Sequence, residues 1–358
     1  MRRRLFVPVA LAALLAAAYG GWWLYAAASF EDAILRWAEA RRAEGRRVAV
    51  EGLAMGGFPL WITAVADRVE LGDEQPAPWH WAGPRTEASA RPWSFRRIVV
   101  SAPGAHRIET LGPDGARAVT PVEARDARGE IALDEAGRIV QLDILLRTVT
   151  ARAPDGSLWS AERAAVAAVP VAADAAPSAA DPRARESLRL ALVFENVDLP
   201  SDLKAGLGRR IHQAEASLAV RGEIPAARPR QALEAWRAAG GTLEVTKLRL
   251  VWGEFQLEGT GTLALDHELQ PAGALTARLW GVGHAIDALV AQGEMRPRDG
   301  ATAKTVLRTL AKRNDQPGIP PEIEVPVTVQ ERRVRAGPAL IATLPRLAWP
   351  GDGPAGAH

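Results

Sequence analysis

The side chains best suited to metal or acid–base chemistry in this sequence are a few histidines that lie near carboxylates. His267 stands in the run Asp266-His267-Glu268, and His284 precedes Asp287 by three residues at the predicted start of a helix. A zinc site needs three or four ligands that converge on one point. Neither group has a further ligand nearby in sequence, and His80 lies between two tryptophans. We therefore predict no metal site.

Other motifs of catalysis are missing from the sequence or incomplete. No Gly-x-Ser-x-Gly run signals a hydrolase serine. The run Gly259-Thr260-Gly261 lacks the third glycine of a dinucleotide loop and the lysine of a phosphate loop, so we interpret it as small residues in a twisted strand. The chain contains no cysteine, which excludes thiolate catalysis, disulfides and cysteine metal sites. We expect a protein that is not an enzyme and has no cofactor.

The N-terminus has the pattern of a membrane-spanning helix. Arg2, Arg3 and Arg4 precede an uncharged apolar stretch from Leu5 to Ala28. A helix needs about 20 apolar residues to cross a bilayer, and flanking arginines stay on the cytoplasmic side. Trp22, Trp23 and Tyr25 suit the opposite interface. The sequence predicts a single-pass anchor over residues 1–28, with the N-terminus in the cytoplasm. In a bacterial-type cell, the bulk of the chain would then lie in the periplasm, anchored to the inner membrane.

A cleaved signal peptide is the alternative to a retained anchor. Ala26-Ala27-Ala28 offers the small residues of a cleavage site before Ser29. The apolar run is longer than the ~7–15 residues usual for a signal peptide, and bulky aromatic residues lie close to the cut. These two features favour retention.

Composition restricts the class of protein and its partners. Of 358 residues, 48% are hydrophobic and 24% are charged, which suits a globular fold. The formal net charge is only +2, and no basic block contains interleaved aromatic residues, so we expect no binding to nucleic acid. An Ala- and Pro-rich segment over 169–186 has no periodicity and is predicted to link two β-rich halves, 29–168 and 187–350. Residues 351–358 are predicted to be a disordered tail.

Most of the chain alternates apolar and polar residues, as strands do. In the most regular stretch, Leu243 and Val245 are out of phase with Leu248 and Leu250, and the slip predicts a β-bulge. Asp134-Glu135-Ala136-Gly137 predicts a hairpin turn. Helices are predicted from Ser29, as a capping residue, to Gly45, and over 228–239, 284–291 and 301–313. The fold class is therefore α+β, with mostly antiparallel curved sheet and a few helices after the N-terminal transmembrane helix.

Further landmarks along the chain are Gly56-Gly57-Phe58-Pro59, Arg91-Pro92-Trp93, Ser101-Ala102-Pro103-Gly104, Trp252-Gly253, Gly259-Thr260-Gly261-Thr262-Leu263-Ala264-Leu265-Asp266 and Leu344-Pro345-Arg346-Leu347-Ala348-Trp349-Pro350. Together with the N-terminal anchor and the helix from Ser29 to Gly45, the order of these landmarks resembles the DUF2125 family of alphaproteobacterial proteins, over nearly the whole chain. That family has no assigned function, so the resemblance implies no catalytic residues. The chain is more broadly similar to AsmA-like envelope proteins, which implies an inner-membrane anchor and an apolar-lined β-groove linked to lipid movement.

Two functions are compatible with such a sheet. In the first, the sheet binds phospholipid acyl chains on an apolar face without covalent chemistry. In the second, the sheet is a scaffold that holds envelope proteins at the membrane. Exposed inward faces of the sheet would favour the first function over the second. The residues predicted to line the apolar groove are Trp61, Trp252, Phe255, Leu257 and Trp280.

Overall fold

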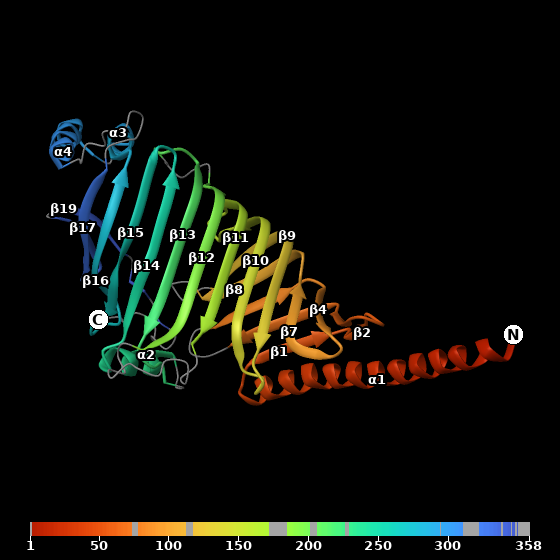
Figure 1. The fold of residues 1–358 in the computed structure, drawn as a ribbon. Helices are drawn as coiled ribbons and strands as arrows, with labels where there is room; N and C mark the ends of the chain where they lie inside the picture. The colour runs from red at the N-terminus through yellow and green to blue at the C-terminus, as the bar shows by residue number, and fades with distance from the viewer. Residues whose placement is uncertain are drawn as a thin grey trace.

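The computed structural model describes residues 2–349, apart from gaps at 74–77, 112–116, 172–184, 201–205, 226–228, 294, 311–321, 338, 345 and 348. Within this part, one long helix precedes a single antiparallel sheet that carries a few short helices (Figure 1). The predicted fold class is confirmed. The predicted tail at 351–358 and most of the predicted linker at 169–186 lie outside the described residues.

The N-terminal helix α1 (Arg2–Ala43) runs without interruption from the predicted anchor into the sheet domain. The prediction that Ser29 begins a new helix was wrong. Its hydroxyl donates a hydrogen bond to the Tyr25 carbonyl one turn earlier, because the strong helix formers Ala26-Ala27-Ala28 carry the helix through. The last helical residue of α1 is Ala43, and the predicted stop Gly45 follows in the left-handed region with φ 83°. Hydrogen bonds from Gly45 and Arg46 to the carbonyls of Arg42 and Arg41 close its last turn.

The sheet is an up-and-down meander in which each strand pairs with the strand before it and the strand after it. Each of the first four strands of the meander is broken once into two pieces: β1 with β2, β3 with β4, β5 with β6, and β7 with β8. Each broken strand pairs with the next one piece by piece, so that β2 pairs with β3 and β1 pairs with β4. The strands are β1 (Arg47–Glu51), β2 (Ala54–Gly56), β3 (Ile62–Ala66), β4 (Arg68–Asp73), β5 (Trp79–Gly83), β6 (Thr86–Arg91), β7 (Ser94–Ser101), β8 (Gly104–Leu111), β9 (Arg117–Leu133), β10 (Ile139–Arg152), β11 (Leu158–Pro170), β12 (Glu186–Asp198), β13 (Arg210–Arg221), β14 (Thr242–Trp252), β15 (Phe255–Leu265), β16 (Pro271–Trp280), β17 (Ile323–Gln330), β18 (Arg333–Ala336) and β19 (Ala339–Thr343).

Three short helices lie between the C-terminal strands: α2 (Pro229–Ala238), α3 (Val282–Ala291) and α4 (Pro297–Leu310). Each overlaps a helix predicted from sequence. The α3 helix contacts β15, and α4 contacts α3 and β17. Strands β11 and β12, on either side of the predicted linker, are hydrogen-bonded neighbours, so one sheet runs through both predicted halves.

Two local predictions about the sheet are confirmed. The turn between β9 and β10 is closed by the Asp134 carboxylate, which accepts hydrogen bonds from the backbone N–H groups of Ala136 and Arg138. In β14 the register slips at the predicted place, because Ser217 opposes Lys247 whereas Leu218 opposes Val245. Thr246 is therefore the extra residue of a β-bulge.

The buried core of the described residues lies under the second half of α1. Trp23, Ala26, Ala27 and Phe30 of α1 pack on the face of the sheet that carries Ile62, which is 0% exposed. The Phe30 ring stacks on Phe95 with 5.4 Å between ring centroids. This packing joins α1 rigidly to the N-terminal end of the sheet, which Figure 1 shows beside the helix.

Candidate functional site

The register of the strands separates the sheet into an apolar face and a polar face. Directly opposed residues of an antiparallel pair point to the same side, and side chains alternate along each strand. Leu192 on β12 opposes Val166 on one side and Ala216 on the other, and Ala216 opposes Leu248. Followed strand by strand, this side carries no charged residue from β10 to β17. Its larger side chains are Leu142, Ile144, Leu146, Val149, Trp159, Val166, Leu188, Leu190, Leu192, Phe194, Val197, Ile211, Leu218, Val220, Leu243, Val245, Leu248, Leu250, Trp252, Phe255, Leu257, Leu263, Leu275, Leu279, Ile323, Val325, Val327 and Val329.

The opposite side is the polar face, and it carries rows of alternating charge. Glu215, Arg249, Glu258, Arg278 and Glu324 oppose one another in order across β13 to β17. Glu258 makes ion pairs with both Arg249 and Arg278, at 3.3 and 3.2 Å. Opposite charges on facing strands stabilise a sheet whose side faces water. The polar face is therefore the solvated side.

A line of backbone irregularities, the crease, crosses the sheet at right angles to the strands. The ladder skips Thr148 and Asn196, which both have φ 49° in the left-handed region. These residues are in register with the breaks between the paired N-terminal strands, such as the break at Asp67. On β10 the apolar positions are 142, 144 and 146 before the crease and 149 and 151 after it. The shift in phase keeps the same face apolar while each strand bends.

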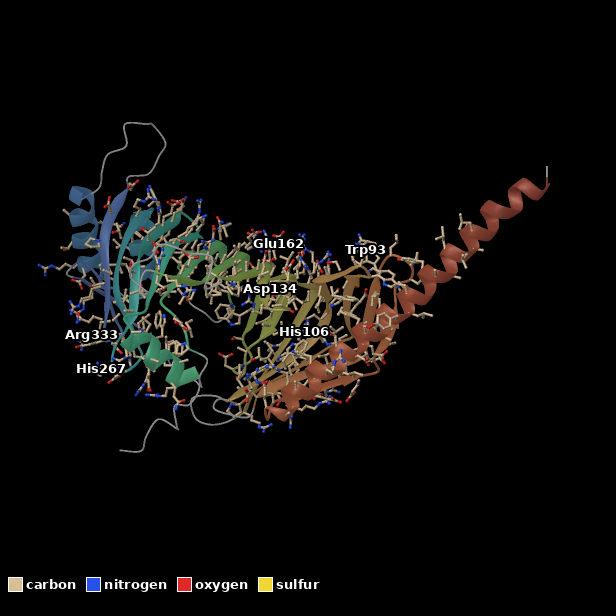
Figure 2. All side chains as sticks on the ribbon, turned by 60° about the horizontal axis from the view of Figure 1, so that its bottom comes forward. Trp93, His106, Asp134, Glu162, His267 and Arg333 are labelled. Atoms are coloured by element: carbon tan, nitrogen blue, oxygen red, sulfur yellow. The ribbon has the colours of Figure 1, made fainter. Side chains whose placement is uncertain are left out.

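The bend at the crease places the apolar face on the inner side. On β9, Ala124 and Ala127 of the apolar face flank the crease and are 0% and 5% exposed. Arg125 of β9 and Glu162 of β11, on the other side of the crease, are exposed. Figure 2 shows Glu162 on an outer surface of charged side chains and His106 on the inner side. From β1 to β13 the sheet is thus a trough with the crease along its floor, and the apolar face of β14 to β17 continues the trough on one side of the crease.

Most of the trough has no second layer of structure in the part of the chain that is described. The α1 helix covers the apolar face over β2, β3, β6 and β7. Beyond β9 most of the larger side chains of this face stay half-buried or exposed, and Ile144 and Phe194 are each 38% exposed. The exceptions in the list above are Val220, Val245, Ile323 and Val329, which are buried. A covered sheet of this composition would bury the others as well, so the trough is an open apolar surface.

His106 of β8 is a titratable side chain on the apolar face. His106 stacks on Trp81 with 5.9 Å between ring centroids, and its Nε2 atom is buried with no hydrogen-bond partner among the described residues. Burial lowers the pKa of His106 below its ordinary value of 6.5, although a hydrogen bond to the Ala102 backbone and the charge of Glu123 oppose the shift. Burial therefore favours the neutral imidazole, which fits an apolar surface.

The structure brings together three of the five residues predicted to line a groove. Trp252, Phe255 and Leu257 lie half-buried on the apolar face at the β14–β15 hairpin. Trp280 opposes Gln256 and therefore lies on the polar face. Trp61 is in the turn before β3, next to α1. The main lining residues, such as Leu190 and Leu192, were not selected from the sequence, although their alternation from Leu188 to Phe194 marks one apolar side.

The histidines near carboxylates lie apart from one another. His80 is on the polar face, where its Nε2 is 3.2 Å from Glu70. His284 is 2.9 Å from Glu254, and His267 is in an exposed turn. Among the described residues, no three His, Asp or Glu side chains gather where a metal ion would sit.

The comparisons with known proteins identify a family. A family model described as "Uncharacterized protein conserved in bacteria (DUF2125)" matches residues 23–345. The chain belongs to the DUF2125 family. Neither the curated proteins nor the solved structures that were compared include a match to it. The matched DUF2125 segment begins within α1, so it includes the aromatic residues Trp23 and Phe30 that join the helix to the sheet. The broader similarity to AsmA-like envelope proteins stays a prediction.

Proposed function

We propose that this DUF2125 protein is a membrane-anchored periplasmic protein that binds phospholipid acyl chains in the trough, without covalent chemistry. One observation carries the proposal: the apolar face of β10 to β17 is continuous, uncharged and half-exposed over many strands. Exposed apolar patches on proteins are rarely larger than a few hundred Å² unless they bind something. Acyl chains are an occupant with matching polarity and no need for hydrogen bonds.

The physical gain from such binding is burial of apolar surface on both partners. A fully buried CH₂ group contributes about 0.8 kcal/mol, and a chain lying in an open trough gains about half of that for each group. From β10 to β17 the described residues of the trough offer no polar side chain that would fix a single position along the acyl chain. Binding of this kind is therefore expected to select for chain-like apolar ligands rather than for one head group.

Arginines at the strand ends suit the head groups of bound lipids. Arg138 precedes β10, Arg152 ends it, and Arg209 precedes β13, so they lie at the rims of the trough. Each makes a hydrogen bond to a carboxylate or a carbonyl in its own turn. A guanidinium has five N–H donors, so a phosphate can share it with these partners.

The packing of α1 supports a retained anchor over a cleaved signal. Among the described residues, one helix is long and apolar enough to cross a membrane, over Leu11–Ala43. Cleavage after Ala28 would remove Trp23, Ala26 and Ala27 from the buried core and leave Ile62 uncovered. Because losing large buried side chains costs several kcal/mol each, we expect the mature protein to keep its N-terminus.

The test compares two neighbouring positions of β12 that face opposite sides. Leu192 is on the floor of the trough and Val193 is on the polar face, and both are half-buried. The full-length protein, L192K and V193K are each purified from membranes in mild detergent, and their bound lipid is quantified by extraction and mass spectrometry. We expect phospholipid with the wild type and V193K, and a several-fold loss in L192K. Equal lipid in the two variants, with both folded by circular dichroism, would refute the trough as the binding site.

A wild-type protein that carries no lipid, and takes none up from vesicles, would instead support the scaffold function with envelope proteins. In that case the apolar face would be covered by protein. Chemical cross-linking in membranes would then join positions on the apolar face, such as Leu192, to partner chains.

A further inference from the structure

A second apolar surface, separate from the trough, lies where α1 leaves the sheet. The turn over residues 57–61 and the turn between β6 and β7 bring large side chains together beside the helix. We call this surface the aromatic patch. Its members are all at least 40% exposed: Trp22, Phe58, Leu60, Trp61 and Trp93.

The aromatic patch is tied to α1 by hydrogen bonds and ring contacts. The Tyr19 hydroxyl donates to the Pro59 carbonyl, and the Trp23 indole N–H donates to the Trp61 carbonyl at 2.9 Å. The Phe58 ring lies 6.2 Å from the Tyr19 ring and 5.5 Å from the Trp23 ring, between centroids. The depth of the patch along the helix is therefore fixed at the level of Tyr19 to Trp23.

That level coincides with the end of the membrane-spanning part of α1. A span of about 20 residues that begins at Leu5 ends near Leu24. The described side chains from Leu11 to Ala18 are all exposed and apolar, so this stretch has no protein partner within the structure. The first contacts with the sheet domain are those of Tyr19 and Trp23. If α1 crosses the bilayer, the aromatic patch has to lie at its interface.

The chemistry of the aromatic patch matches a membrane interface. Tryptophans are enriched where the head groups meet the acyl chains. The guanidinium of Arg91 lies over the Trp61 ring, 3.7 Å from its centroid, and 5.7 Å from the centroid of Trp93. A cation held over indoles in this way presents charge to phosphate groups while the rings enter the apolar layer.

We propose that the aromatic patch inserts into the interface of the bilayer that holds α1, and thereby fixes the N-terminal end of the trough at the membrane surface. Figure 2 shows Trp93 at the end of the sheet where α1 emerges, with His267 and Arg333 at the opposite end. Eleven inter-strand steps of about 4.8 Å separate β3 from β17, or about 50 Å along the sheet. The trough then leads away from the membrane, with its first strands at the lipid surface. This inference rests on the proposed retained anchor and not on lipid in the trough.

The absence of cysteine makes the test direct, because one introduced cysteine is the only labelling site. Full-length L60C and W93C report on the two turns of the aromatic patch, and both positions are exposed and tolerant of a label. L14C reports on the span, and A136C in the β9–β10 turn is the water-exposed control. Each protein carries a nitroxide and is reconstituted in vesicles of phosphatidylcholine and phosphatidylglycerol. Electron paramagnetic resonance then measures the access of oxygen, which concentrates in lipid, and of a water-soluble nickel complex.

We expect labels at positions 60 and 93 to be several-fold less accessible to nickel than the label at position 136, and more accessible than the label at position 14. Nickel access at 60 and 93 equal to that at 136, with 14 immersed, would overturn the insertion of the aromatic patch alone. Nickel access at 14 as high as at 136 would overturn the anchor and the insertion together. Neither of these two outcomes bears on the binding of lipid in the trough.

Discussion

Deletion of Thr246 is expected to destabilise the protein much less than deletion of Thr262, although the two deletions each remove one exposed threonine, from adjacent strands. Thr246 is the bulge residue of β14, and the pairs on either side of it are Val245 with Leu218 and Lys247 with Ser217. Removing it lets these pairs become consecutive steps of a regular ladder. The known loss is one exposed hydrogen bond, from the Thr246 hydroxyl to the Ser217 carbonyl, worth about 1 kcal/mol or less.

Thr262 lies in the regular part of β15, so its deletion shifts every residue that follows by one position. A one-residue slip moves each side chain to the other face of a sheet. Leu263 and Leu265, which are half-buried, would move to the polar face. A half-buried leucine contributes about 1 kcal/mol, so the two together cost about 2 kcal/mol. For a chain of this size that lowers the melting temperature by about 3 °C.

The assay is thermal unfolding of the full-length variants in one detergent, followed by tryptophan fluorescence and circular dichroism. We expect the Thr246 deletion to melt within about 1 °C of wild type, given the single exposed hydrogen bond that it loses. We expect the Thr262 deletion to melt clearly lower. Equal destabilisation by the two deletions would refute the assignment of Thr246 as an extra residue, and with it the register that defines the two faces.

Three further outcomes follow from packing and burial. The G261A variant is expected to lose stability, because a Cβ there would overlap the backbone of β16, whereas G259A should melt like wild type, since its nearest neighbour would be an ordinary 3.5 Å away. The I62A variant should lose about 2–5 kcal/mol in denaturant unfolding, and L35A on the exposed side of α1 much less. Because the pKa of His106 is lowered in the folded state, the unfolded chain binds more protons below about pH 6.5, so stability falls as the pH falls through the folded pKa. When the pH is lowered from about 7 to about 5, the free energy of unfolding of the H106F variant should fall less than that of the wild type. The same dependence of this free energy on pH in both proteins would contradict the burial of a neutral histidine.

The alternation of residue types predicted much of this architecture, because a strand must place successive side chains on opposite sides. The run from Leu188 to Phe194 already separates one apolar side from one polar side. The phase slip after Val245 located the bulge, and the Asp134 turn was identified by its residue types. The end of α1 just before Gly45 was predictable for the same reason, since a glycine readily adopts the left-handed conformation that closes a helix.

Other features depended on which segments meet in space. Ser29 has the pattern of a cap, but the helix continues through it because nothing in the preceding alanines breaks it. Trp280 was predicted to line the groove, but the side it occupies follows from its pairing with Gln256 across a hairpin. The exposure of the apolar face is also invisible in sequence, because an alternating strand looks the same whether a second layer covers it or not.

The sequence by itself therefore determined the strands, the apolar and polar side of each strand, and the apolar N-terminal helix, since these depend on local periodicity and length. The tertiary structure alone decided that the apolar sides of successive strands join into one surface, and that this surface bends inward along the crease. It also decided that the aromatic patch meets α1 at Tyr19. These features require contacts between residues far apart in the chain, and the left-handed residues Thr148 and Asn196 that form the crease carry no local signature of their alignment.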